Sequence, residues 1–195
     1  ATVTYGATVV PILPDFNPVD ITHIINHSEA ELLFVSDQIW EHIEFDKLLN
    51  VKGVISLNSK KLLAEAEGAD IKKELRLLRR RFNAKYKNGF TRDHIVYPEI
   101  DNSQMLVLNY TSGTTGFPKA IIHAHKSLTQ AAETEQNHHS QTKDDVFLCI
   151  PPFYHTGAKM HWFGSFYVGG KAVILKGVKP EWIIKAVSDE RCSIV

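Results

Sequence analysis

Four hydroxyl residues, two glycines and one lysine stand within nine consecutive positions of the chain. After the apolar run MLVLNY, the segment reads Thr111-Ser112-Gly113-Thr114-Thr115-Gly116-Phe117-Pro118-Lys119. Glycines let the backbone approach an anion and turn its N–H groups inward, hydroxyls add neutral donors, and a lysine adds a mobile positive charge. The segment therefore predicts a phosphate-binding loop that is entered from a buried strand.

The spacing excludes two other kinds of catalytic loop. The nucleotide-binding loop of P-loop NTPases needs Lys directly after its second glycine and a helix behind it, whereas Phe117 and Pro118 follow Gly116 and a strand is expected next. The Gly-x-Ser-x-Gly turn of serine hydrolases is excluded as well, because Tyr110 and Thr114 occupy the glycine positions around Ser112.

The run NYTSGTTGFPKA resembles the signature loop of the adenylate-forming (AMP-binding) superfamily, which includes acyl-CoA synthetases, aryl-CoA ligases, firefly-type luciferases and peptide-synthetase adenylation domains. Residues 6–37 and 150–175 are similar to the family segments on either side of that loop. One departure is Ala120, where the family usually has Gly. It follows the lysine, so we expect a local backbone adjustment and intact phosphate binding.

The resemblance implies an AMP-forming acid–thiol ligase that uses ATP, Mg²⁺ and coenzyme A. In the family reaction a carboxylate attacks the α-phosphorus of ATP and expels pyrophosphate, and a thiol then captures the acyl-adenylate. By this resemblance Lys119 offsets charge on the pyrophosphate and His155 lies beside the acyl pocket, so both are candidate catalytic residues. No metal ligand is assigned. The residues implied in binding the β- and γ-phosphates are Thr111, Ser112, Gly113, Thr114, Thr115, Gly116 and Lys119.

The acid is expected to be fatty or aromatic. Family members that activate amino acids carry an aspartate where this chain has Tyr154, and a buried substrate ammonium without that counter-charge would be costly. The aromatic-rich residues 160–167 are interpreted either as a wall for an acyl chain or aryl ring, or as ordinary core packing. Two alternative functions stay open: a noncatalytic nucleotide-binding remnant, and an adenylation domain for another class of acid.

Composition and charge are those of a globular protein without a general attraction for polyanions. The chain has 195 residues, 44% of them hydrophobic and 23% charged, and its 22 basic and 22 acidic side chains cancel. The expected partners are a carboxylic acid, ATP and coenzyme A, with no nucleic acid. No apolar run reaches the roughly 18 residues of a transmembrane segment, and the first residues lack a signal-peptide pattern. Cys149 and Cys192 are interpreted as buried, reduced thiols, which indicates the cytoplasm.

Residues 72–87 form a strongly basic segment with helical periodicity. It contains eight basic residues and one acidic residue, Glu74. One interpretation is a solvated helix whose Leu75, Leu78 and Phe82 pack inward. The other is a surface for an anion or a nucleic acid.

β-rich runs alternate with helical stretches, which predicts an α/β fold with largely parallel sheet layers flanked by helices. Most of the strands are too apolar to face water. The expected strands span residues 7–12, 31–35, 53–57, 104–110, 120–124, 145–150, 171–175 and 192–195.

Capping signals predict where several helices begin or end. Asn17 can cap a helix that starts at Pro18, with Phe16 packing onto Ile21. Further signals are a capping box of Ser127 and Gln130, a helix that begins near Thr156 and is stopped by Gly169 and Gly170, and a helix that starts at Pro180.

Members of the family are more than twice as long as this chain. Residues 1–195 are therefore interpreted as a fragment of the large N-terminal domain, with a variable basic helix and linker over 58–103 and the phosphate loop and acyl-pocket segment over 104–195. The family's adenine-binding, ribose-binding and thiol-delivery elements are expected beyond Val195. We expect the 195 residues by themselves not to turn over ATP.

Overall fold

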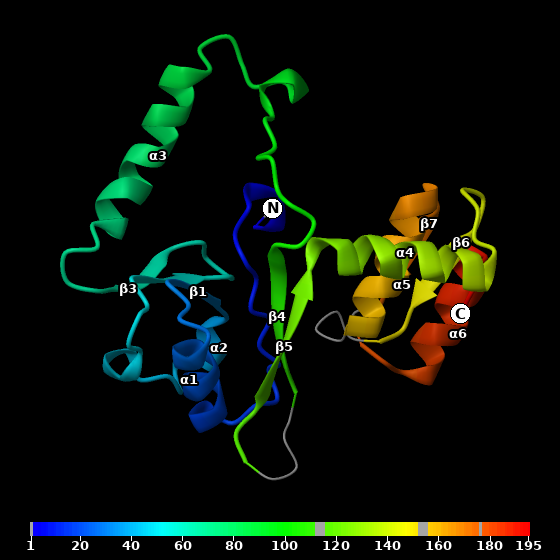
Figure 1. Ribbon diagram of the computed structural model, residues 1–195, viewed down its shortest axis with the longest axis horizontal. Helices are drawn as coiled ribbons and strands as arrows, with labels where there is room; N and C mark the ends of the chain where they lie inside the picture. Colours follow the sequence, from blue (N-terminus) through cyan, green and yellow to red (C-terminus); the bar gives the residue numbers. More distant parts are fainter. Residues whose placement is uncertain (1, 112–115, 152–155, 176) are drawn as a thin grey trace. The chain divides into compact units, whose positions relative to one another are not determined.

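The computed structural model describes residues 2–111, 116–151, 156–175 and 177–195, in which helices and strands alternate along much of the chain (Figure 1). These residues form two compact units, one of residues 1–99 and 108–121 and the other of residues 100–107 and 122–195. The division passes through β4 (Met105–Thr111) and β5 (Lys119–Ala124), which pair as a two-stranded sheet. The predicted α/β class is confirmed.

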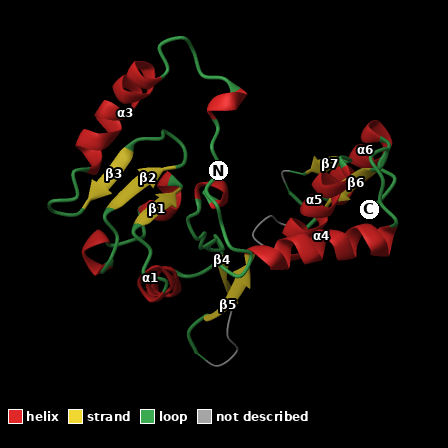
Figure 2. Ribbon diagram, turned by 45° about the horizontal axis from the view of Figure 1, so that its top comes forward, coloured by secondary structure: helices red, strands yellow, loops and turns green. Residues whose placement is uncertain are grey.

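The first unit contains a three-stranded sheet in the order β1-β2-β3 (Figure 2). Its strands are β1 (Leu32–Val35), β2 (Gly53–Ser56) and β3 (Leu62–Glu65). β1 and β2 run parallel, as predicted, whereas β2 and β3 run antiparallel, and β3 was not expected from the sequence. Short helices complete the unit: η1 (Val3–Tyr5), α2 (Asp37–Trp40), η2 (Phe45–Lys47) and η3 (Arg92–His94).

Helix α1 (Pro18–His27) begins where its capping signals predict. The Asn17 Oδ1 atom accepts a hydrogen bond from the Asp20 backbone N–H at 2.9 Å, which satisfies one of the free donors of the first turn. Ile21 and Ile25 are buried in the core beneath β1 and β2, while Ile24 packs in a second cluster with residues of β4. One short helix therefore joins the three-stranded sheet to the strand that leads into the predicted phosphate loop.

Two strands expose more apolar surface than the sequence predicts. β1 buries Leu33 and Val35 but leaves Leu32 and Phe34 exposed, and β5 leaves Ile122 68% exposed. The expectation that most strands are too apolar to face water therefore does not extend to β1 and β5 in the chain as described. The helix that covers β1 packs on one of its faces only, and alternate residues of a strand point to opposite faces.

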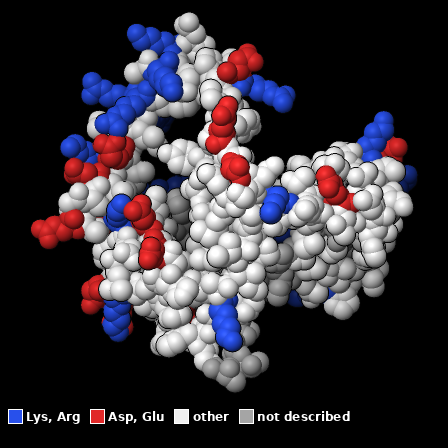
Figure 3. Space-filling view, viewed as in Figure 1, with Lys and Arg blue, Asp and Glu red and all other residues white. Residues whose placement is uncertain are grey.

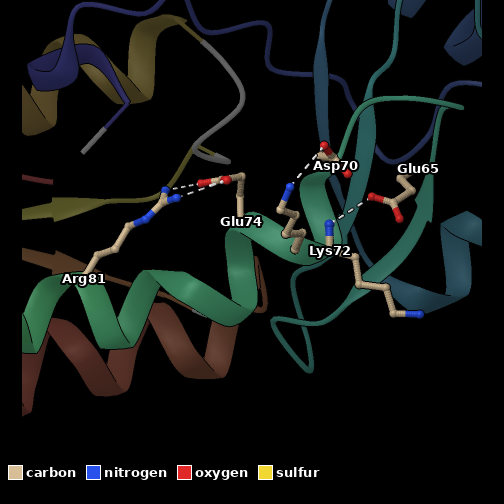
Figure 4. A network of polar contacts seen from close by, with 6 residues as sticks. Glu65, Asp70, Lys72, Glu74 and Arg81 are labelled. Atoms are coloured by element: carbon tan, nitrogen blue, oxygen red, sulfur yellow. Dashed lines mark hydrogen bonds and ion pairs between the residues drawn. The ribbon is translucent and has the colours of Figure 1, made fainter.

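The basic segment forms helix α3 (Ile71–Lys85), and Figure 3 shows Lys and Arg side chains gathered over it. Two of its cations are paired, Lys73 with Asp70 at 3.7 Å and Arg81 with Glu74 (Figure 4). The expected inward packing is wrong, because three apolar side chains are exposed: Leu75 by 36%, Leu78 by 62% and Phe82 by 45%.

The second unit is built on β6 (Val146–Cys149) and β7 (Lys171–Ile174), which run parallel. Ile194 forms a parallel bridge to Phe147, so the predicted C-terminal strand is reduced to a single bridge. The helices of this unit are α4 (His125–His139), α5 (Thr156–Val168) and α6 (Pro180–Glu190). α5 packs against both α4 and β6.

Capping of α4 differs from the prediction, while the ends of α5 and α6 agree with it. α4 starts at His125, two residues before the expected cap Ser127, and has no side-chain cap. α5 ends at Val168, before Gly169 with φ 76°, and α6 starts at Pro180. No described helix is long and apolar enough to span a bilayer.

Both cysteines are free thiols. Cys149 is buried, as expected, and burial raises its pKa above the ordinary thiol value, whereas Cys192 is only half-buried.

Candidate functional site

The predicted phosphate loop lies between two paired strands. Thr111 is the last residue of β4 and Lys119 is the first residue of β5, and both are exposed. The Lys119 ammonium forms no ion pair within the described part of the chain, so it is available to an anionic ligand. Ser112, Gly113, Thr114 and Thr115 lie outside the described residues, as does His155.

Gly116 adopts a backbone conformation that favours glycine. Its φ is 142°, and a Cβ built there would meet no atom within 4 Å. Glycine is therefore favoured at position 116 by the backbone angle and not by a lack of space, because a side chain at this φ clashes with its own backbone. The next residue, Phe117, is 57% exposed, and Pro118 after it is buried.

Replacing Gly116 by alanine should destabilise this turn. We expect Gly116→Ala to lower the free energy of unfolding by about 1–3 kcal/mol, since alanine rarely occupies this region of φ. Urea denaturation measures the change. Gly157→Ala is the matched control: this glycine lies in α5 at ordinary φ with open space around it, so alanine should be neutral or stabilising by up to about 1 kcal/mol. Equal effects of the two substitutions would contradict the prediction.

Four aromatic rings form a row beside the loop: Phe117, His23, His27 and Tyr110. Successive ring centroids are 4.2, 5.6 and 5.7 Å apart. This row was not predicted from the sequence. The signal that could have indicated it is the spacing of His23 and His27, which places both on one face of α1.

The aromatic helix α5 combines core packing with exposed rings. Trp162 packs edge-on against Phe163 and Phe166 at centroid distances of 5.1 and 4.5 Å, while Phe166 is still 63% exposed. Lys159, on the same helix, is half-buried, and burial lowers its pKa. The helix thus has exposed aromatic surface with which an apolar acyl group could pack.

The described ranges hold no group of three or more His, Cys, Asp or Glu side chains suited to a metal ion. The described residues of the predicted phosphate-binding set offer the Thr111 hydroxyl, the Gly116 N–H and the Lys119 ammonium. Such donors suit phosphate oxygens.

Comparison with known proteins identifies relatives along the whole chain. The model of a family described as AMP-binding enzyme matches residues 1–195. The 4-hydroxybutyrate–CoA ligase 2 of Metallosphaera sedula is 29% identical over 191 residues, covering 95% of this chain and 33% of the ligase. The medium-chain-fatty-acid–CoA ligase of Ectopseudomonas oleovorans is 26% identical over 163 residues, covering 79% of this chain and 27% of that enzyme.

Solved structures share the fold. A long-chain-fatty-acid–CoA ligase from Archaeoglobus fulgidus superimposes with a TM-score of 0.72 at 19% identity, covering 96% of this chain and 34% of that one. ATP-bound MatB from Rhodopseudomonas palustris superimposes with a TM-score of 0.69 at 17% identity, covering 96% of this chain and 34% of that one. Some curated relatives match nearly all residues of this chain, and the chain spans about a third of the length of those relatives.

Proposed function

The chain belongs to the family of AMP-binding enzymes, and from that membership we propose that it is part of an acid–thiol ligase that activates a carboxylic acid with ATP and transfers it to coenzyme A. One observation carries the proposal. Three members of the predicted phosphate-binding set are described: Thr111 ends β4, Lys119 begins the paired strand β5, and Gly116 lies between them in the chain. The Lys119 ammonium is exposed and forms no ion pair with a described residue.

The proposed chemistry needs charge stabilisation and positioning more than a reactive side chain. The substrate carboxylate attacks the α-phosphorus, the bond to the bridging oxygen breaks, and pyrophosphate leaves with its electron pair. The Thr111 hydroxyl and the Gly116 N–H would donate hydrogen bonds to the β- and γ-phosphates, and Lys119 would stabilise the charge that develops on the leaving group. Mg²⁺, when bound with ATP, would supply further positive charge to neutralise the phosphates. We propose that His155 lies beside the substrate carboxylate.

For the substrate we propose a fatty or aromatic carboxylic acid. Tyr154 stands where amino-acid-activating members have an aspartate, and relatives are named for 4-hydroxybutyrate and medium-chain fatty acids. Activation of such acids would place the enzyme in fatty-acid or aromatic-acid metabolism. The two free thiols are in keeping with the reducing cytoplasm.

We further propose that two segments of the chain have different roles. Residues 58–103 would form a variable basic helix and linker, whereas residues 104–195 would supply the phosphate loop and part of the acyl pocket.

The test is ATP–pyrophosphate exchange by the complete ligase over a panel of fatty, aryl and α-amino acids. We expect exchange that requires both Mg²⁺ and a fatty or aryl acid, followed by AMP and thioester formation when coenzyme A is added. Exchange with α-amino acids alone would instead indicate an adenylation domain for another class of acid. Binding of ATP without exchange for any acid would indicate a noncatalytic nucleotide-binding protein.

A further inference from the structure

Helix α1 places two histidines against the strand and the loop that carry the proposed chemistry. His23 and His27 are one helical turn apart, and their ring centroids are separated by 5.6 Å. Between them in sequence, Ile24 is completely buried and clusters with Leu108 and Tyr110 of β4. The position of both histidines is therefore set by a packed core contact between α1 and β4.

His27 holds the residue at the upstream end of the loop. Its Nδ1 atom lies 2.7 Å from the Tyr110 hydroxyl oxygen, and Tyr110 directly precedes Thr111. Tyr110 is only 3% exposed, and burial raises the pKa of its phenol, so the hydroxyl stays protonated at neutral pH. A buried phenol tied to a helix gives the last residues of β4 little freedom to move.

His23 holds the residue at the downstream end. Its ring stacks on Phe117 with centroids 4.2 Å apart and an interplanar angle of 17°, and Phe117 directly follows Gly116. Phe117 is 57% exposed, so the stack is a surface contact that orders a side chain with little other burial. Offset-stacked rings at this distance attract one another beyond the area that they bury.

We propose that α1 acts as a brace for the phosphate-binding loop, with His27 and His23 as positioning residues that hold Tyr110 and Phe117 at its two ends. The inference rests on the proposed function. A loop held at both ends before ATP arrives loses less conformational entropy on binding, and the fraction of enzyme that is competent to bind rises. The brace should consequently act on the affinity for ATP more than on the chemical step.

The test compares ring-removing and ring-conserving substitutions in the complete ligase. We expect His23→Leu and Phe117→Leu each to raise the KM for ATP by about threefold to tenfold, the range that one aromatic pair supports, with kcat changed less than about twofold. His23→Phe restores a ring and should return KM to near the wild-type value. The double variant His23→Leu with Phe117→Leu should be no worse than either single variant, because both remove the same contact.

The hydrogen bond between His27 and Tyr110 is tested in the same way. His27→Phe and Tyr110→Phe each remove the hydrogen bond while keeping a ring, and we expect each to raise KM for ATP by about twofold to tenfold, with no further increase when they are combined. The matched control is His42→Leu, because His42 is exposed in the same unit and takes no part in the His27–Tyr110 or His23–Phe117 contact. It should leave KM unchanged.

Hydrogen exchange measured without substrate tests the brace independently of the proposed reaction. Hydrogen exchange of peptides that contain Phe117 should be faster in His23→Leu than in wild type and normal in His23→Phe. Unchanged exchange and unchanged KM in His23→Leu, or failure of His23→Phe to restore either, would overturn the brace while leaving the ligase function intact. Absence of pyrophosphate exchange in the wild type would overturn the function, and hydrogen exchange would still decide whether α1 orders the loop.

Discussion

Replacing Lys119 by alanine should slow ATP–pyrophosphate exchange by the complete ligase by about 100- to 1,000-fold, the usual effect of removing one donor that stabilises transition-state charge. The ammonium is exposed at the start of β5 and has no ion-pair partner among the residues that the structure describes. Its positive charge is therefore available to the leaving pyrophosphate. The fold should be unaffected, because the side chain lies on the surface and holds no core contact.

Two further variants define the role of this charge. Lys119→Arg keeps the cation but spreads it over a planar group, so we expect partial recovery of exchange. Lys61→Ala removes an exposed lysine elsewhere in the same unit and should leave exchange unchanged. Circular dichroism and thermal unfolding check that all three variants fold. Wild-type exchange in Lys119→Ala would remove this residue from the proposed mechanism.

Replacing Ile24 by alanine should destabilise α1 by about 2–4 kcal/mol, the range for truncating a fully buried isoleucine. Ile24 is 0% exposed and packs between the helix and β4, in a cluster with Leu108 and Tyr110. Alanine would remove three carbon atoms from this contact and leave a cavity. Native-state hydrogen exchange of α1 amides measures the change as a lower free energy of opening.

The same substitution should also weaken ATP binding, because the helix that carries His23 and His27 would be held less firmly against β4. Val19→Ala is the control: this side chain lies on the same helix but is 66% exposed, and its loss should change the opening free energy by less than about 0.5 kcal/mol. A loss below about 1 kcal/mol for Ile24→Ala would show that the contact between α1 and β4 contributes little.

Capping residues, prolines and glycines in the sequence correctly predicted several helix ends, because those ends depend on residues close by in the chain. The cap at Asn17, the first-turn Pro180 and the stop at Gly169 each act within a few positions of the chain, and the structure confirms all three. A helix end is satisfied by groups close in sequence, so its pattern can be read without knowing the fold.

The predicted capping box at Ser127 failed for a tertiary reason. The backbone N–H groups of His125 and Lys126 donate to the carbonyl oxygens of Gln104 and Asn102, at 3.1 and 2.9 Å. Because these distant carbonyls satisfy donors at the start of α4, the helix begins three residues earlier than a helix capped by Ser127 would, and it has no side-chain cap.

The apolar stripe of α3 shows a different limit. Its periodicity predicted the helix correctly, but periodicity identifies the apolar face without saying what lies against it, and Leu78 and Phe82 are exposed in the described chain.

The sequence by itself determined which chemistry is proposed for this protein. Glycine, hydroxyl and lysine residues in one short segment predict a phosphate-binding loop, because their donors act through neighbouring backbone and side-chain atoms. Only the tertiary structure decided which residues contact Tyr110 and Phe117. His27 meets Tyr110 across 83 positions of the chain, and Phe117 lies against the same helix, because burial of Ile24 brings α1 onto β4. The spacing of His23 and His27 places both on one face of α1, but which strand that face meets follows from packing in three dimensions.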